Sequence, residues 1–301
     1  MPPPPPSAGV EPPPAPAAVE EPAPVSPPPA LPAVEFAEGA NAPPPDKAPT
    51  IALRAPARDQ VIPLDKAGDF EVKLDVKGWD VPAGGNHIHL ILDGHPYKRI
   101  DAPTLPIKLK DIDPNYELKE GQHVLVAFPS RHTHESVKPI GKVAPLAVVP
   151  FWIGKKSKDA AWKPTDPTFI FSRPKGANNG PPPAEGILVD FYVANAELGD
   201  GKFSIEATLK GPGLEDGKTV TIKDWKPWRI KNPRSGAYTL HMVLNGKDAK
   251  PVPGAWNDVT REFRVDLDAP PDPHPMPPPD GAAKDKPVDA KDKGTPPAKK
   301  K

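Results

Sequence analysis

The chain has 301 residues with 39 basic and 39 acidic side chains, so no net charge draws it toward nucleic acid or a membrane surface. It contains 51 prolines and no cysteine, which excludes disulfides, thiolate catalysis and zinc–thiolate sites. Its longest apolar run, Val143 to Ile153, contains two prolines and is too short to span a bilayer. We therefore expect no transmembrane segment and no nucleic-acid partner.

Proline is concentrated at the two ends of the chain. Residues 1–47 hold 18 prolines without a hydrophobic period, and residues 270–301 hold ten more among alternating Asp and Lys. Such segments cannot bury enough apolar surface to fold. We predict a disordered proline-rich arm over 1–47 and a disordered tail over 270–301.

The first residues do not resemble a signal sequence, because Met1 is followed directly by five prolines. Read literally, this start indicates a cytoplasmic protein; the alternative is a chain that has lost its leader. We favour the second, by analogy with proline-rich arms that hold small β domains away from a cell envelope. The expected location is periplasmic, cell-surface or secreted.

The middle of the chain contains short alternating segments that occur twice. The first alternating segment lies between two prolines, and both copies close with a last strand. The matched pairs are 49–56 with 167–174, 70–76 with 187–193, 88–94 with 205–211, 107–112 with 220–225, 121–125 with 236–240, and 147–153 with 262–267.

Short strands separated by Gly, Pro, Asn and Asp, without a reliable helical period, favour antiparallel sandwiches over a parallel sheet. We predict an all-β protein made of two tandem antiparallel immunoglobulin-like β-sandwiches between disordered proline-rich tails. The expected boundaries are 48–154 for the first domain, 155–166 for a polar linker and 167–269 for the second domain.

The segment Gly236-Ala237-Tyr238 resembles the tyrosine corner of immunoglobulin-like and fibronectin-type domains, in which a tyrosine hydroxyl bonds to the backbone before the sixth strand. The first copy has His123 in the place of Tyr238. A histidine can donate the same bond, so we favour a structural role for His123. The resemblance implies tandem β-sandwiches of this type.

Two histidines lie on the face of residues 87–92 that the repeat marks as solvated. Alternate residues from Ile88 to Leu92 match apolar residues of the second copy and form the core face, whereas His87 and His89 match a serine and a glutamate. We therefore expect both histidines side by side on the outer face of the first domain.

In an immunoglobulin-like strand order, the neighbouring strand adds Val126 and Phe128 to this face beside Ile91, and its hairpin loop carries His132 and His134. An outer face this apolar is typical of a binding site. Imidazole nitrogens are preferred ligands of zinc and copper. The metal hypothesis uses His87, His89, His132 and His134; the alternatives are tolerated strand histidines, or a patch covered by the arm or by the second domain.

These histidine-bearing strands and the His-x-His-Glu loop resemble uncharacterised bacterial envelope domains with histidine-rich strands, from which no activity follows. In the second copy we expect Trp225 in the core, and Trp228 and Trp256 in exposed loops. Aromatic rings of this kind stack on sugars or protein partners. The candidate ligand surface therefore comprises Ile91, Val126, Phe128, Trp228 and Trp256.

No catalytic residue is predicted. Ser130 and Ser136 flank the histidine loop but lack an elbow motif and a carboxylate to orient a base. We expect a non-enzymatic, envelope-associated or secreted binding or structural module with a protein or glycan partner and no required cofactor. The alternative is a histidine-based zinc- or copper-binding protein.

Overall fold

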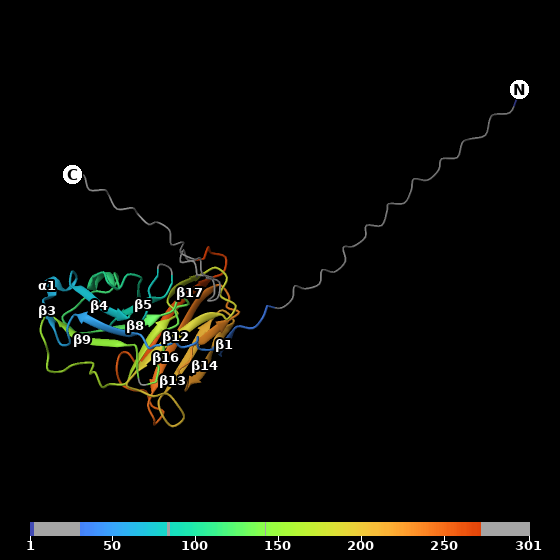
Figure 1. The fold of residues 1–301 in the computed structure, drawn as a ribbon. Helices are drawn as coiled ribbons and strands as arrows, with labels where there is room; N and C mark the ends of the chain where they lie inside the picture. Colours follow the sequence, from blue (N-terminus) through green and yellow to red (C-terminus); the bar gives the residue numbers. More distant parts are fainter. Residues whose placement is uncertain (3–30, 83–84, 142, 272–301) are drawn as a thin grey trace, which may run out of the picture. The chain divides into compact units, whose positions relative to one another are not determined.

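The computed structural model describes residues 1–2, 31–82, 85–141 and 143–271. The disorder predicted for 1–47 and 270–301 falls largely outside these residues. Strands dominate the described chain, with one short helix, α1 (Leu64–Ala67), and one 3-10 turn, Leu109–Asp111. The strands form two β-sandwiches (Figure 1).

The first sandwich pairs a three-stranded sheet, in the order β2-β4-β7, with a five-stranded sheet, in the order β3-β9-β8-β5-β6. Its core lies between the two sheets and contains Ile88, Leu90 and Leu92, as their alternation predicts. The strands are β2 (Thr50–Ala55), β3 (Val61–Ile62), β4 (Glu71–Lys77), β5 (His87–Leu92), β6 (Lys98–Ile100), β7 (Ile107–Lys108), β8 (Gly121–Ser130) and β9 (Ala147–Ile153).

The second sandwich pairs a sheet in the order β1-β15-β12-β10 with one in the order β11-β17-β16-β13-β14. Its core includes the aromatic rings of Phe169, Phe191 and Tyr238. The strands are β1 (Glu35–Glu38), β10 (Thr168–Arg173), β11 (Gly176–Asn179), β12 (Ile187–Ala194), β13 (Ser204–Gly211), β14 (Leu214–Ile222), β15 (Trp228–Lys231), β16 (Gly236–Asn245) and β17 (Asp258–Asp266).

Apart from β1, which has no counterpart in the first sandwich, the two sandwiches share one topology. In the five-stranded sheet of the first sandwich, β8 pairs antiparallel with β5 and β9, and in that of the second, β16 pairs antiparallel with β13 and β17. In both sheets a short edge strand pairs parallel with the last strand, β3 with β9 and β11 with β17. This is an immunoglobulin-like arrangement, so the predicted fold class is confirmed.

One matched pair of the predicted repeat is wrong. By its place in the sheet, β7 corresponds to β15, whereas residues 220–225 begin at the end of β14, which corresponds to β6. The reason is length, since β6 has three residues and β14 has nine. Matching the alternating residues of the two copies without a gap therefore pairs β7 with the end of the longer strand β14.

Part of the predicted disordered arm is folded. Glu35–Glu38 form β1, which pairs antiparallel with β15 and places Phe36 opposite Ile230 (Figure 1, blue). Val34 and Phe36 are each only 6% exposed because they enter the core of the second sandwich. The average composition of residues 1–47 conceals this local strand, so the prediction of disorder is wrong for these residues.

A third cluster of buried residues lies between the two sandwiches. Aromatic rings from the two sides meet there, with the centroids of Phe128 and Tyr192 5.3 Å apart. Residues of the predicted polar linker take part as well, since Trp162 is 8% exposed and its Nε1 donates to Thr168 Oγ1 at 3.0 Å. The outer face of β5 and β8 is therefore an interface between the two sandwiches.

Candidate functional site

The predicted pairing of β5 with β8 fixes the position of two histidines. His87 lies opposite Ser130, and His89 lies opposite Phe128. Both imidazoles point away from the core of the first sandwich, as the period of two predicts. Both residues are nevertheless 0% exposed. The expected exposure is wrong because the second sandwich and the loop after β8 cover this face.

The loop after β8 brings a third histidine to the same place. The amide of Arg131 donates to the carbonyl of Glu135, and His134, inside this turn, has a φ of 68°. Left-handed backbone is uncommon for a residue other than glycine and occurs often at functional sites. It directs the imidazole of His134 over β5, where its Nδ1 lies 3.0 Å from His87 Nε2.

The three imidazoles form a compact group. His87 Nε2 also lies 3.0 Å from His89 Nε2, and one ring nitrogen from each of the three residues lies within 4.8 Å of the others. His87 Nδ1 donates to the carbonyl of Gly85 at 3.1 Å. In the neutral ring, Nε2 of His87 therefore has a single lone pair, which faces two nitrogens at equal distance. We call His87, His89 and His134 the histidine group.

Neighbouring residues orient the rings of the histidine group. His89 Nδ1 lies 3.0 Å from Ser172 Oγ, on β10 of the second sandwich. The Tyr97 ring stacks on His89 with centroids 3.5 Å apart, and its hydroxyl lies 3.0 Å from His134 Nδ1. Ser172 contacts the nitrogen of His89 that faces away from His87, as is usual for a metal-binding histidine. The Tyr97 hydroxyl instead contacts the same nitrogen of His134 that faces His87. No sequence pattern links Ser172 or Tyr97 to the histidines, so sequence reasoning missed both.

All three imidazoles are held in the neutral form. Burial lowers the pKa of His87 to about 4 and lowers the pKa of His89 well below its usual value. Burial, followed by the charge of Arg173, also lowers the pKa of His134. A neutral imidazole has the free lone pair that metal coordination requires. The histidine group therefore needs no deprotonation near pH 7 in order to bind a metal.

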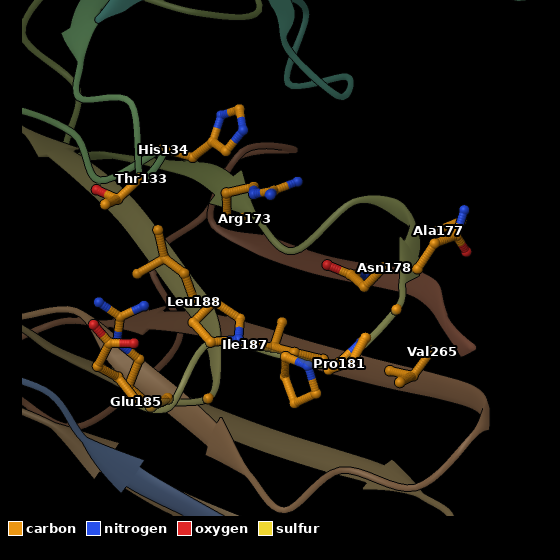
Figure 2. A pocket seen from close by; sticks show the side chains of 16 residues that line it. Thr133, His134, Arg173, Ala177, Asn178, Pro181, Glu185, Ile187, Leu188 and Val265 are labelled. Atoms are coloured by element: carbon orange, nitrogen blue, oxygen red, sulfur yellow. The ribbon is translucent and has the colours of Figure 1, made fainter. Parts of the chain in front are cut away.

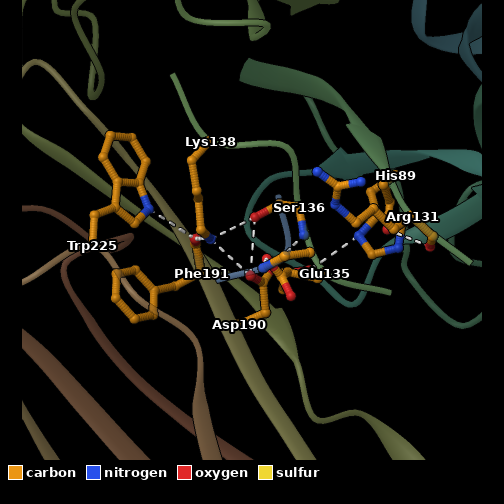
Figure 3. A network of polar contacts seen from close by, with 11 residues as sticks. His89, Arg131, Glu135, Ser136, Lys138, Asp190, Phe191 and Trp225 are labelled. Atoms are coloured by element: carbon orange, nitrogen blue, oxygen red, sulfur yellow. Dashed lines mark hydrogen bonds and ion pairs between the residues drawn. The ribbon is translucent and has the colours of Figure 1, made fainter. Parts of the chain in front are cut away.

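A second polar network holds the loop in place (Figure 3). Asp190, fully buried on β12, accepts from Lys138 Nζ at 2.7 Å and from Ser136 Oγ at 3.0 Å. Lys138 also donates to the carbonyl of Phe191 at 2.8 Å. The ion pair joins the segment after His134 to the second sandwich. Ser136 Oγ also accepts from Lys138 Nζ at 2.7 Å, so its hydroxyl and the ion pair form one network.

The remaining predicted site residues lie elsewhere or are buried. His132 is in the same loop as His134 but outside the histidine group. Trp228 is half-buried in β15, 5.1 Å from the ring of Phe36. The predicted ligand surface is not exposed, because the other four members are buried between the sandwiches, namely Ile91, Val126, Phe128 and Trp256.

The structural role predicted for His123 is confirmed. Its Nε2 donates to the carbonyl of Lys119 at 2.8 Å, and Tyr238 Oη donates to the carbonyl of Arg234 at 3.1 Å. The predicted tyrosine corner is therefore present in the second sandwich, with an imidazole counterpart in the first. Trp225 is partly buried, and its Nε1 donates to the carbonyl of Phe191 at 3.2 Å.

No protein-family model matches the chain, and no curated protein matches it. Among solved structures, the fibronectin(III)-like modules of CbhA from Clostridium thermocellum are 12% identical, with 72% of this chain and 94% of that chain covered and a TM-score of 0.24. The FN1–FN3 domains of chicken CNTN1 are 10% identical, with 73% and 67% covered and a TM-score of 0.21.

SGBP-B of Bacteroides ovatus, solved with a mixed-linkage heptasaccharide, is 10% identical, with 73% of this chain and 71% of that chain covered and a TM-score of 0.20. Likenesses of this size carry no inference about function, which rests below on the residues of this chain. In the part of the chain that the structure describes, no helix has the length and apolar character needed to cross a membrane.

Proposed function

We propose that the protein is a non-enzymatic β-sandwich module that binds one divalent transition-metal ion, zinc or copper, through His87, His89 and His134. The observation that carries this proposal is the convergence of three imidazole nitrogens within 4.8 Å of one another. They come from β5 and from the loop after β8.

The geometry of the histidine group is close to that of a metal site. With zinc–nitrogen bonds of about 2.0–2.1 Å, two nitrogens in a tetrahedral site lie roughly 3.3 Å apart. The two nitrogen–nitrogen distances from His87 Nε2, to His89 and to His134, are both 3.0 Å. Small ring movements open the group enough for an ion. The hydrogen bonds to Gly85 and Ser172 already hold two rings in a coordinating orientation.

The position of the proposed ion supports a structural role. All three ligands belong to the first sandwich, but Ser172 of the second sandwich orients His89. Metal binding and docking of the two sandwiches are therefore coupled. An ion that binds the folded state and not the unfolded chain stabilises the protein by mass action. Bound metal would therefore strengthen the docking of the two sandwiches.

Calorimetric titration of the full, metal-free chain with Zn²⁺ and Cu²⁺ tests the proposal. We expect one saturable site, and we expect the double variant His87→Ala, His89→Ala to lose it. His132→Ala is the matched control, since it removes an imidazole from the same loop without touching the histidine group. Absence of saturable binding to the unaltered chain, or equal loss in His132→Ala, would contradict the proposal.

We also infer that the module works at a cell envelope or outside the cell and contacts a protein or glycan. This inference is supported by the proline-rich arm, which enters the folded part through β1. Fractionation of cells that make the native gene product tests the location. Recovery in the cytosolic fraction alone would contradict the proposed location. That result would not bear on metal binding, which the calorimetric titration tests.

A further inference from the structure

A pocket opens beside the histidine group, between the loop after β8 and the segment from β10 to β12. In Figure 2, His134 and Arg173 lie on one side of it, with Ile187 and Leu188 below them in the view. Val265 adds to the apolar part of the lining. His134 thus belongs both to the histidine group and to the wall of an open pocket.

Two arginines line this pocket, Arg173 and Arg229, and Arg173 is the one that lies beside His134 in Figure 2. It ends β10 and is half-buried, yet its guanidinium makes no hydrogen bond or ion pair with any residue in the described ranges. Its charge reaches the histidine group, where it contributes to the lowered pKa of His87, His89 and His134. A buried or half-buried guanidinium normally has an acceptor. Arg173 therefore presents an unused, forked donor beside the proposed metal.

The charge around the histidine group is positive. Three neutral imidazoles bring no negative charge to a divalent ion. Lys175 adds a further positive charge, since its Nζ donates to the carbonyl of Tyr97 at 2.7 Å and lies 3.9 Å from the centroid of the Tyr97 ring, which stacks on His89. Asp190 pairs with Lys138 and Asp101 pairs with Arg99. The pocket's own carboxylate, Glu185, lies away from His134 and Arg173, beyond Leu188 in Figure 2. An ion bound by the histidines alone would leave like charges close together without compensation.

We propose that the metal centre takes an exchangeable anionic ligand from this pocket, an organic carboxylate with a small apolar body, bound between the ion and Arg173. This inference rests on the proposed metal binding. The guanidinium fork matches a carboxylate, and the apolar body packs on Ile187, Leu188 and Val265. Thr133 supplies a further donor at the wall, because its buried hydroxyl has no partner among the described residues.

Cobalt(II) provides a visible-absorption probe of a zinc-type site in the full chain. The metal-free protein is first titrated with Co²⁺ in buffer without carboxylates, and the loaded protein is then titrated with hexanoate. We expect a saturable change in the cobalt spectrum with hexanoate and none with hexanol, its neutral counterpart. Sulfate, which has the charge but no apolar body, is expected to bind at least tenfold more weakly than hexanoate.

Arg173→Gln separates the anion from the metal. We expect this variant to bind hexanoate at least tenfold more weakly, while its Co²⁺ affinity in anion-free buffer stays equal or rises, because a like charge has been removed. Arg54→Gln is the control, since Arg54 is a surface residue paired with Asp75 in the first sandwich. It should leave both titrations within twofold of the unaltered chain.

The outcomes distinguish the two proposals. Cobalt binding without a hexanoate response, or an unchanged response in Arg173→Gln, overturns the anionic ligand and leaves the metal centre in place. Equal hexanoate affinity with and without Co²⁺ also overturns it, because the anion would then not contact the ion. Absence of cobalt binding overturns the proposed metal function, and the anionic ligand with it.

Discussion

The imidazole of His123 holds in the first sandwich the position that the phenol of Tyr238 holds in the second. Each side chain donates to the carbonyl of the residue four positions earlier in the chain. The duplicated fold has kept this bond and changed the group that makes it. Because an imidazole titrates near neutral pH and a phenol does not, the first sandwich has a pH dependence at this corner that the second lacks.

The first prediction concerns this corner. Burial lowers the pKa of His123, but the Asp93 carboxylate, 2.6 Å from Nδ1, and the Lys119 carbonyl outweigh it, so the net pKa is raised. The stabilisation is complete below about pH 6.5, the unfolded value, and is lost as the pH rises through the raised value. We expect His123→Phe to lower the free energy of unfolding by about 2 kcal/mol at pH 6 and by less at pH 9.

Urea unfolding at the two pH values measures this difference. His241→Phe is the control, because His241 is exposed on β16 and pairs with Asp258 at the surface. It should change the free energy of unfolding little at either pH. An equal loss for His123→Phe at pH 6 and pH 9 would show that the imidazole is not charged in the folded protein.

The second prediction concerns acid and the metal-free histidine group. Burial lowers the pKa of His87 to about 4, so its contribution to stability is present above about pH 6.5 and is lost as the pH falls toward 4. Each such histidine contributes at most about 1.4 kcal/mol per pH unit to the slope of the free energy of unfolding against pH. Between pH 6.5 and pH 4.5 the free energy of unfolding should fall less steeply in His87→Gln than in the unaltered chain. His132→Gln should leave this fall unchanged. A slope that is the same in both variants contradicts the buried, neutral state of His87.

The third prediction tests β1. Phe36 is 6% exposed and packs in the core of the second sandwich. Removal of a buried aromatic ring leaves a cavity, so we expect Phe36→Ala to lower the free energy of unfolding by about 3 kcal/mol. Leu31→Ala is the control, since Leu31 is 73% exposed. Equal midpoints of urea unfolding for the two variants would mean that residues 35–38 do not join the sheet in solution.

The fourth prediction tests the ion pair in Figure 3. Lys138→Met leaves the carboxylate of Asp190 buried and unpaired, which we expect to lower the free energy of unfolding by about 3 kcal/mol. The double variant Lys138→Met, Asp190→Leu removes both charges and should recover most of this loss. A double variant that is no more stable than Lys138→Met would show that the pair itself, and not the unpaired charge, determines the loss.

Strand periodicity predicts the faces of β5 but not what covers them. The alternation from Ile88 to Leu92 identifies the core face, so it also places His87 and His89 on the opposite face. Nothing in a period of two distinguishes a face in water from a face against another domain. Ile91 and Phe128 were the available signal, since apolar side chains on an outer face suit an interface as well as a ligand site.

The histidine group depends on geometry that a sequence does not display. His134 reaches β5 because of a single left-handed residue within a turn, and His132, two positions earlier, does not. Ser172 meets His89 across the interface from 83 positions further along the chain. The strand β1 escaped prediction for a different reason, because two buried side chains are too few to alter the average composition of a proline-rich segment.

The placement of β1 has a mechanical consequence. The described chain enters the second sandwich through β1, continues through the whole of the first sandwich, and returns to the second sandwich at β10. The first sandwich is therefore inserted between β1 and β10 of the second. Tension applied between the two ends passes through the β1–β15 contact and the second sandwich. The first sandwich, with its histidine group, stays outside the path of the force until β1 detaches from β15.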